Sequence, residues 1–143
     1  MIDEIDQQIL RHLSADGRAS HRELGKAVGL SPNAAGARMA RLIDQGVITG
    51  VHAAIDPAAL GRPLEVTIDI WLEQRPNDDT FLELAVRDDR IVETIHITGP
   101  VDYRVLAHVA SPEDLDNLLA TMRREGAVNQ TDSRIVMRRL PTA

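Results

Sequence analysis

The sequence predicts an α+β chain in which an N-terminal (winged) helix-turn-helix domain precedes a βαββαβ ferredoxin-like domain. Apolar residues recur at helical spacing over residues 1–50, where two capping signals flank a short glycine-containing turn. From residue 64 onward apolar residues alternate with polar ones, as in half-buried strands. We therefore predict a DNA-binding domain over residues 1–50, a strand or linker over 51–63, and a ferredoxin-like domain over 64–143.

Residues 19–50 have the features of two short helices joined by a tight turn. Ser20 is a favourable N-cap, and Glu23 three residues later completes a capping box. A Val-Gly-Leu turn follows at 28–30, a Ser-Pro pair at 31–32 opens the second helix, and Gly46 follows its end. This order is typical of a helix-turn-helix, whose second helix enters the major groove of DNA. The stripe expected to face inward on that helix is Ala35, Met39, Leu42 and Ile43.

Both flanks of this motif have predicted structure. Asp3 is expected to cap a first helix that runs to about Leu13, with Gly17 as its stop. Its inward residues are Ile5, Ile9, Leu10 and Leu13. After the second helix of the motif, Val47 to Ala54 is expected to form a short hairpin wing or an extended strand. The Pro- and Gly-containing segment 56–63 is the predicted linker.

The second domain is predicted from an order of strand and helix patterns. Val66, Ile68, Ile70 and Leu72 alternate with polar residues in the first strand. The predicted strands are 64–73, 91–98, 103–110 and 131–139, and the helices are 77–87 and 111–125. The inward residues of these helices are Phe81, Leu84 and Ala85, and then Leu115, Leu118, Leu119 and Met122. Helices on one face of an antiparallel sheet follow from this order.

Composition limits the functions that this chain can have. The chain has no cysteine, which excludes disulfides and thiolate metal sites, and its five histidines lack metal-ligand spacing. No apolar run approaches the roughly 20 residues that span a bilayer, and the acidic N-terminus lacks the basic region of a signal peptide. We therefore expect a cytoplasmic protein with no membrane partner and no metal.

Charge is distributed unevenly along the chain. The formal net charge is −6, yet cations and acids are equal in number over residues 1–50. Within the helix-turn-helix the cations outnumber the acids, which favours a modest attraction to phosphates. Aromatic residues are only 2% of the chain, so base stacking on an aromatic platform is not its way of binding nucleic acid.

The DNA-facing residues are predicted from a helical wheel at about 100° per residue. Arg41 is the clearest cation expected to face DNA, whereas Arg38 lies on the flank, where it contacts a phosphate or only stabilises the domain. Gly36 costs about 1 kcal/mol relative to Ala in a helix, and close approach to the groove floor is its predicted reason. The outward residues are Asn33, Ala37, Ala40, Arg41 and Asp44. The predicted DNA-binding residues are Arg22, Ser31, Asn33, Ala34, Ala37, Arg38 and Arg41.

Few of these side chains make bidentate contacts with bases, so we expect degenerate recognition that depends strongly on DNA shape. The open face of the sheet carries Trp71 and Glu73, and an uncovered face of this kind predicts dimerisation. Asp69 shares that face, where paired carboxylates are usually solvated or at an interface.

The whole chain resembles the Lrp/AsnC family, the leucine-responsive or feast/famine transcriptional regulators. The fragments that carry the resemblance keep the family's order and spacing from one end of the chain to the other. They are Asp3-x-x-Asp6-x-x-Ile9-Leu10-x-x-Leu13, Asp16-Gly17-Arg18, Leu30-Ser31, Arg38, Leu42, Gly46-Val47-Ile48-x-Gly50, Asp56-Pro57, Gly61, Thr98-Gly99-Pro100-Val101-Asp102-Tyr103, Gly126-Ala127-Val128, Thr131 and Ser133.

The resemblance implies a DNA-binding domain followed by an effector-binding domain of the RAM type. It implies double-stranded DNA and a small amino acid or related metabolite as partners, and homodimers that stack into octamers. The expectation that the protein is not an enzyme and has no cofactor or catalytic residue rests on this resemblance of the whole chain, not on composition. The implied effector site includes Thr98, Gly99, Pro100, Asp102, Tyr103, Thr131 and Ser133. Asp102 is expected to accept from the ammonium group of an amino acid, while Tyr103 is more often a packing residue. Val51 replaces a common aromatic residue, and Ser133 keeps only the hydroxyl of a threonine pair.

Two other classes of function remain as alternatives. Sirohaem decarboxylases look like this same two-domain architecture, although the chain has few aromatic residues to line a tetrapyrrole pocket. An architectural DNA-binding protein without an effector is the second alternative. A haem-coloured preparation would favour the first, and a flat ligand screen would favour the second.

Overall fold

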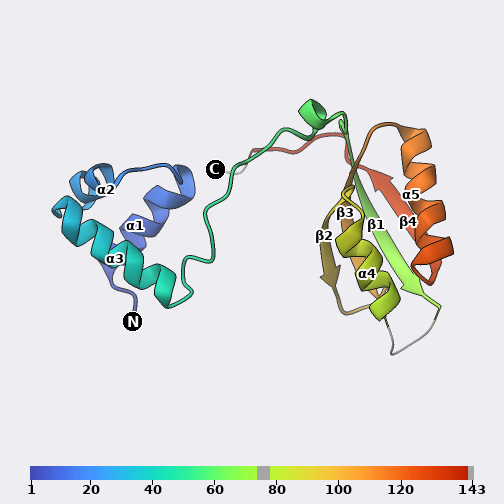
Figure 1. Ribbon diagram of the computed structural model, residues 1–143, viewed down its shortest axis with the longest axis horizontal. Helices are drawn as coiled ribbons and strands as arrows, with labels where there is room; N and C mark the ends of the chain where they lie inside the picture. The colour runs from blue at the N-terminus through green and yellow to red at the C-terminus, as the bar shows by residue number, and fades with distance from the viewer. Residues whose placement is uncertain (74–77, 142–143) are drawn as a thin grey trace. The chain divides into compact units, whose positions relative to one another are not determined.

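The computed structural model describes residues 1–73 and 78–141, which form two compact units. The first unit is Met1–Ala54 and the second begins at Ile55. The elements are α1 Glu4–Ala15, α2 His21–Val28, α3 Pro32–Asp44, the 3-10 helix η1 Pro57–Leu60, β1 Leu64–Leu72, α4 Asp79–Arg87, β2 Ile91–His96, β3 Tyr103–Val109, α5 Pro112–Glu125 and β4 Val128–Ile135 (Figure 1). None of the helices in the described residues is long and apolar enough to cross a membrane.

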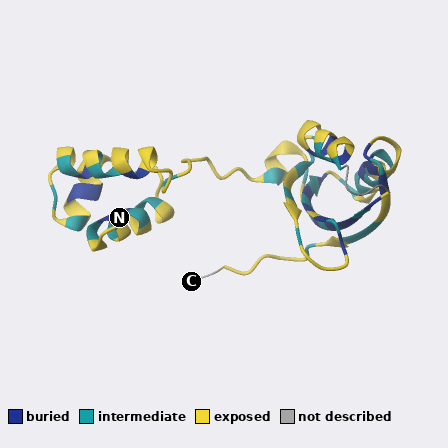
Figure 2. Ribbon diagram, turned by 90° about the horizontal axis from the view of Figure 1, so that it is seen from below, coloured by how far each residue is buried: buried dark blue, intermediate teal, exposed yellow. Residues whose placement is uncertain are grey.

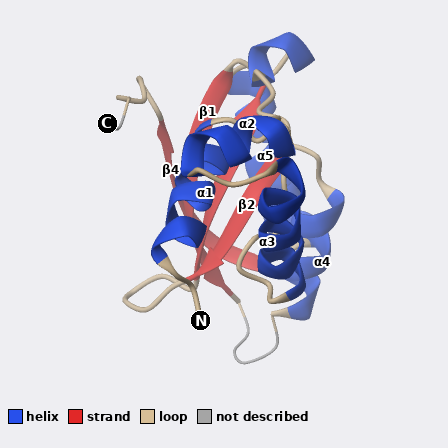
Figure 3. Ribbon diagram, turned by 90° about the vertical axis from the view of Figure 1, so that its left-hand side faces the viewer, coloured by secondary structure: helices blue, strands red, loops and turns tan. Residues whose placement is uncertain are grey.

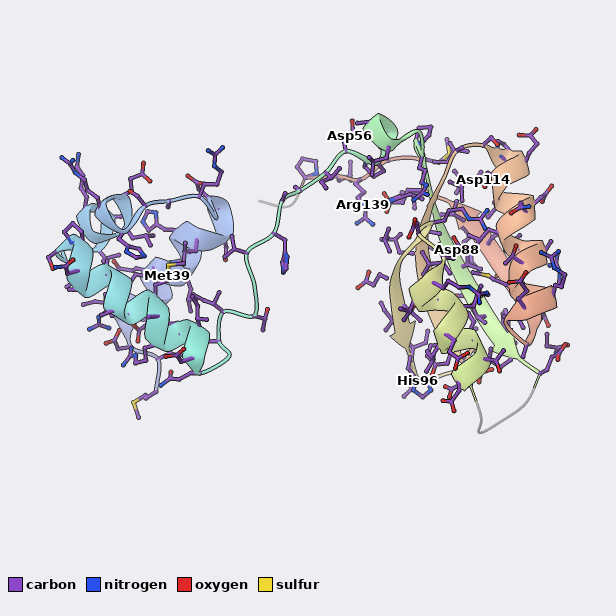
Figure 4. The ribbon with its side chains drawn as sticks, in the orientation of Figure 1. Met39, Asp56, Asp88, His96, Asp114 and Arg139 are labelled. Atoms are coloured by element: carbon purple, nitrogen blue, oxygen red, sulfur yellow. The ribbon has the colours of Figure 1, made fainter. Side chains whose placement is uncertain are left out.

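The first unit is a three-helix core. Ile9 of α1, Leu24 of α2, and Ala35 and Leu42 of α3 are fully buried against one another. Met39 also points into this core (Figure 4). A core made by all three helices explains why they fold as one body although each is short, since isolated helices of this length are marginal in water.

Helix ends in the first unit follow local capping chemistry. Ser20 and Glu23 form the predicted capping box of α2, with the Ser20 backbone N–H donating to the Glu23 carboxylate at 2.7 Å. Asp3 and Asp6 form a second capping box at α1, which ends at Ala15 instead of Leu13. Gly46 has φ of 71° just after α3, as the predicted C′ glycine requires.

Two expectations for the first unit are wrong. Residues 47–54 form no strand and therefore no wing; they leave α3 as an irregular segment. Ile43 is 47% exposed instead of buried, because Ala35 and Leu42 define the inward direction of α3 and Ile43 lies on its flank.

The second unit is a four-stranded antiparallel sheet in the order β2-β3-β1-β4 (Figure 1). Figure 3 distinguishes its strands from the helices by colour. Order and connections give the predicted βαββαβ ferredoxin-like arrangement. The predicted bounds of the last strand, 131–139, are wrong, because β4 runs over Val128–Ile135. Val128 pairs with Leu72 and Ile135 pairs with Val66, so the start of β1 at Leu64 leaves little strand for later residues to pair with.

Helices α4 and α5 cover one face of this sheet, and the buried residues lie between the two layers (Figure 2). Val66, Ile68 and Ile70 of β1 are fully buried there. Of the predicted inward helix residues, Phe81, Leu84, Ala85, Leu118 and Met122 are buried, and Leu115 and Leu119 are partly buried against them. Helix α4 begins at Asp79, and the predicted start at Asn77 lies outside the described residues.

A charged cluster joins the end of α4 to the start of α5. Arg90 donates to Asp88 at 2.7 Å and to Asp114 at 2.8 Å, and its side chain is only 15% exposed. Figure 4 labels both acids. The guanidinium of Arg90 beside Asp88 holds the pKa of that carboxyl below its usual range, against the effect of burial. This cluster therefore fixes one end of the helical layer.

Candidate DNA-binding surface and ligand site

Helix α3 is held at a fixed angle to α2 by a short turn. Ser31 caps α3 by accepting from the Ala34 backbone N–H at 3.1 Å. Gly29 has φ of 77°, a conformation that favours glycine. A Cβ on Gly25 of α2 would lie 2.5 Å from the Leu30 carbonyl oxygen, so the turn approaches α2 too closely for any side chain there. At the N-terminus of α3, Pro32 has no N–H, and the Ala34 and Ala35 N–H groups donate to the hydroxyl and the carbonyl of Ser31.

The outward surface of α3 carries mainly small side chains. Asn33, Ala37, Ala40 and Asp44 are exposed, as the helical wheel predicts, and Ala34 is half-buried. Asn33 is the one amide side chain among them. On the adjoining helix, Arg22 is exposed and forms no ion pair with any described residue.

Both arginines of α3 form ion pairs with acids of the same domain. Arg38 donates through Nη1 to Asp3 at 2.6 Å and to Asp6 at 2.9 Å. Arg41 donates through Nη2 to the other oxygen of Asp6 at 2.5 Å. Arg41 is exposed on α3, as the helical wheel predicts, with a side chain that is 44% exposed, but an ion pair to Asp6 of α1 restrains it. Arg38 takes the flanking, stabilising position that was one of its two predicted roles.

Asp6 is the centre of this network, a role that the sequence analysis does not predict. It is fully buried, and burial alone would raise the pKa of its carboxyl. The Asp3 N–H and the guanidinium groups of Arg38 and Arg41 outweigh burial and lower the pKa of Asp6 to about 2. Only the spacing of Asp3 and Asp6 signals their mutual cap; nothing in the sequence shows that two arginines more than 30 residues away reach the same carboxylate.

Gly36 has an explanation inside the protein. A Cβ at Gly36 would lie 2.6 Å from Nδ1 of His21 on α2. The expectation that Gly36 permits close approach to the groove floor is thus not required, because packing of α2 on α3 already accounts for it.

The turn between β2 and β3 contains most of the predicted effector-site residues. Gly99 has φ of 110°, and Thr98, Gly99 and Pro100 are exposed. Asp102 is half-buried, and its Oδ2 accepts from the Leu72 backbone N–H at 2.8 Å. The Asp102 carboxylate therefore accepts a hydrogen bond from the backbone at the end of β1, and it also lies next to the turn.

Tyr103 is a core residue and shows little surface to a ligand. Its side chain stacks on His96 with ring centroids 4.8 Å apart and contacts Phe81 at 5.2 Å. Its hydroxyl donates in a short hydrogen bond to Asp78, which precedes α4. Burial, together with this hydrogen bond, raises the pKa of Tyr103 to about 12. The packing role expected for Tyr103 is confirmed.

Thr131 and Ser133 both lie on one face of β4, and both are half-buried. They pair with Ile70 and Ile68 of β1, so their side chains are on the helix-covered side of the sheet. Ile70 also pairs with Tyr103 on its other side. Thr131 thus stands two strands from the turn, about 10 Å away across β1, while Ser133 is further along.

The open face of the sheet carries an ion network. Asp69 of β1 receives hydrogen bonds from Arg104 of β3 at 2.7 Å and Arg134 of β4 at 3.3 Å. Asp69 is only 7% exposed, so of the two expectations for this face, a solvated carboxylate or one at an interface, the first does not hold. Arg104 holds the pKa of this carboxyl below its usual range. Trp71 shares the face and is half-buried. Within the described residues, no group of His, Cys, Asp and Glu is arranged to hold a metal ion.

A helix-turn-helix unit followed by a ferredoxin-like unit is the arrangement of a DNA-binding domain joined to a ligand-binding domain in transcriptional regulators. Residues 2–43 match the AsnC-type helix-turn-helix domain, and residues 65–142 match the Lrp/AsnC ligand binding domain. The chain belongs to the Lrp/AsnC family.

Sequence and structural similarity to individual relatives supports this assignment. The chain is 36% identical over 140 residues to the leucine-responsive regulatory protein of Haemophilus influenzae, covering 95% of this chain and 84% of that one. It is 35% identical over 120 residues to the transcriptional regulator Ptr1 of Methanocaldococcus jannaschii, covering 84% and 80%. The feast or famine regulatory protein of Mycobacterium tuberculosis, solved in complex with L-methionine, is 32% identical with a TM-score of 0.91, covering 99% of this chain and 96% of that one.

Proposed function

We propose that this protein is a sequence-specific transcriptional regulator whose binding to double-stranded DNA responds to an amino acid or a related small metabolite, and that it acts as a homodimer. The observation that carries the proposal is the Ser31-capped helix α3, whose exposed face of small side chains is presented by a rigid three-helix core. Such a helix fits the major groove closely.

At the DNA surface, each part has a distinct role. The Ser31 hydroxyl and the Asn33 backbone N–H bind a phosphate at the start of α3, and Arg22 contributes a further phosphate contact. Asn33 reads a base edge, because an amide side chain pairs in bidentate fashion with adenine N6 and N7. Ala34 and Ala37 pack against thymine methyl groups. Arg38 and Arg41 contact the backbone at the flank with the guanidinium nitrogens that Asp6 leaves free.

A single base-reading side chain on α3 predicts a loose operator sequence. Asn33→Ala should lower affinity for a selected operator by about 1–3 kcal/mol and relax the preference at one base position. Ala40→Ser, on the same exposed face but nearer the C-terminal end of α3, is the matched control. Selection of binding sites from random duplexes measures both effects. An unchanged preference for Asn33→Ala would remove Asn33 from the readout.

The proposed effector site is centred on the turn at residues 98–102. An α-amino acid needs an acceptor for its ammonium group, which Asp102 supplies, and N–H donors for its carboxylate, which the open backbone around Gly99 supplies. Thr131 and Ser133 of β4 are separated from this turn by β1, so within one chain they do not line the same site. The L-methionine complex of the M. tuberculosis relative supports an amino acid as the class of effector.

Asp102→Asn is the sharpest variant for this site. The amide oxygen can still accept from the Leu72 N–H, so the end of β1 is kept while the negative charge is lost. We expect the amino acid that stabilises the wild type in a thermal-shift screen to stop doing so. A ligand at about 100 times its Kd adds roughly 2.7 kcal/mol, which makes the loss easy to detect. An unchanged response would place the effector elsewhere.

The same screen separates the regulator from its alternatives. A flat response to all amino acids, with DNA binding retained, would favour the architectural protein. A preparation that retains a tetrapyrrole would favour the decarboxylase-like enzyme, for which the described structure offers no supporting feature.

Dimerisation is proposed to use the open face of the sheet. Trp71 and Leu106 are half-buried on that face, around the neutralised Asp69. Leu106→Lys should break the dimer because it places an unpaired charge in an apolar contact. Val86→Lys is the control: Val86 is 89% exposed on α4, on the helical side. Light scattering at micromolar concentration should report a dimer for the wild type and for Val86→Lys. A monomeric wild type would refute this assembly.

A further inference from the structure

The two aspartates that hold Arg38 are not equivalent. Asp6 is fully buried and shared between Arg38 and Arg41, so it belongs to the framework of the domain. Asp3 has a side chain that is 51% exposed, and Arg38 is its only ion-pair partner among the described residues. The Asp3–Arg38 pair is thus the solvent-facing end of the network.

Arg38 lies at the border between the inner and the outward faces of α3. One turn before it is Ala34 and one residue before it is Ala37, both in the proposed DNA surface. Its side chain is 28% exposed, and the same nitrogen, Nη1, donates to both Asp3 and Asp6. Asp3 therefore fixes a negative charge within 2.6 Å of a cation at the edge of the DNA surface.

We propose that Asp3 opposes DNA binding by competing with a backbone phosphate for Arg38. In the free protein the carboxylate of Asp3 pairs with Arg38. When α3 docks, a phosphate replaces Asp3 at the guanidinium, while Asp6 keeps hold of Nη1. The exchange is feasible because exposed ion pairs are weak and are screened by salt, whereas the buried carboxylate stays in place.

This inference rests on the proposed placement of α3 against DNA. It identifies Asp3 as an acid that lowers the affinity of the protein for DNA. Asp3→Asn removes the charge and keeps the N-cap of α1, because Asn and Asp cap helices about equally well. Glu4→Gln is the matched control. Glu4 is the next residue and is exposed, and its side chain forms no ion pair or hydrogen bond with any described residue, so Glu4→Gln changes the net charge of the same turn equally.

The experiment measures binding of the full chain to a duplex of mixed sequence between about 50 and 200 mM salt. Asp3→Asn should bind about two- to fivefold more tightly than the wild type, as expected for one exposed ion pair. Its salt slope should steepen by up to about 0.9, because in the wild type the displaced Asp3 carboxylate takes up a cation that offsets the one released from the phosphate. Glu4→Gln should show less than half of that gain and no change in slope.

The variant Arg38→Gln provides a second test. Asp3→Asn should give no gain in that background, because the cation for which Asp3 competes is absent. Equal gains in Asp3→Asn and Glu4→Gln, or a gain that persists without Arg38, would overturn the inference while leaving the DNA-binding function intact. Absence of DNA binding by the wild type would overturn both. Far-UV circular dichroism of each variant verifies that α1 still forms.

Discussion

The contribution of Asp6 to stability can be measured directly by the variant Asp6→Asn. This change keeps the size of the side chain and an acceptor for the Asp3 N–H, and it removes the charge that holds Arg38 and Arg41. The buried carboxylate has a pKa of about 2, against an ordinary value of 3.8. Each pH unit of such a difference is worth about 1.4 kcal/mol, so the charged network contributes about 2 kcal/mol.

The pH dependence has a definite sign. Since the pKa of Asp6 is lower in the folded protein than in the unfolded chain, its stabilisation is fully present above about pH 4. It is lost as the pH falls from about 4 to about 2, where both states are protonated. The difference in stability between the wild type and Asp6→Asn should therefore shrink over that window and reach its full size at neutral pH.

The assay can separate the two units because their aromatic residues are distributed unevenly. The single Trp, Trp71, lies in the second unit, so its fluorescence follows that unit alone. Hydrogen exchange in α1 and α3 follows the first unit. A loss of about 2 kcal/mol lowers the midpoint of a unit of this size by about 10 °C. The Trp71 transition should not move.

Glu4→Gln is again the control, since it removes an acid from the same turn without touching the network. The reasoning about Asp6 would be refuted if Asp6→Asn lowered stability no more than Glu4→Gln. It would also be refuted if the loss were the same at pH 2 and pH 7.

Three further predictions concern other parts of the fold. Gly25→Ala should destabilise the first unit by about 1–3 kcal/mol in urea unfolding, because its Cβ would meet the Leu30 carbonyl oxygen at 2.5 Å; a neutral result would show that the turn relaxes. Arg90→Met should cost the second unit about 3 kcal/mol by Trp fluorescence, since it leaves the half-buried carboxylate of Asp114 without its cation, whereas no loss would show that the cluster is only a surface feature. Tyr103, the single tyrosine, should titrate in ultraviolet absorbance near pH 12. Because its pKa is raised above the ordinary 10, the stability it contributes is present below pH 10 and is lost as the pH rises through 12; titration at pH 10 would contradict its burial beside Asp78.

Local sequence determined where most elements begin and end. The caps at Ser20 and Ser31 and the C′ glycine at Gly46 depend on contacts within three or four residues, so their spacing is sufficient to predict them. The alternation of Val66, Ile68 and Ile70 likewise predicts which face of β1 is buried.

The end of β4 shows the limit of local prediction. That strand ends near the point where its partner β1 begins, because later residues have no strand to pair with. The bounds of β1 cannot be predicted from residues 131–139 themselves. The prediction of a strand or wing at residues 47–54 is wrong for the same reason. A strand needs a neighbouring strand to pair with, and the described residues of the first unit provide none for this segment.

Charges that are far apart in the sequence meet only in the folded chain. Arg41 on a helical wheel faces outward, and only the packing of α1 on α3 brings Asp6, 35 residues away, to its guanidinium. Asp69 likewise has the position of a surface acid on β1 until β3 and β4 place Arg104 and Arg134 beside it. Sequence periodicity reports which side of an element is apolar, whereas the partner of each buried charge depends on how elements pack. The sequence thus determined the class of fold and the outward face of α3 that we propose contacts DNA, and the tertiary structure decided which of its cations form ion pairs.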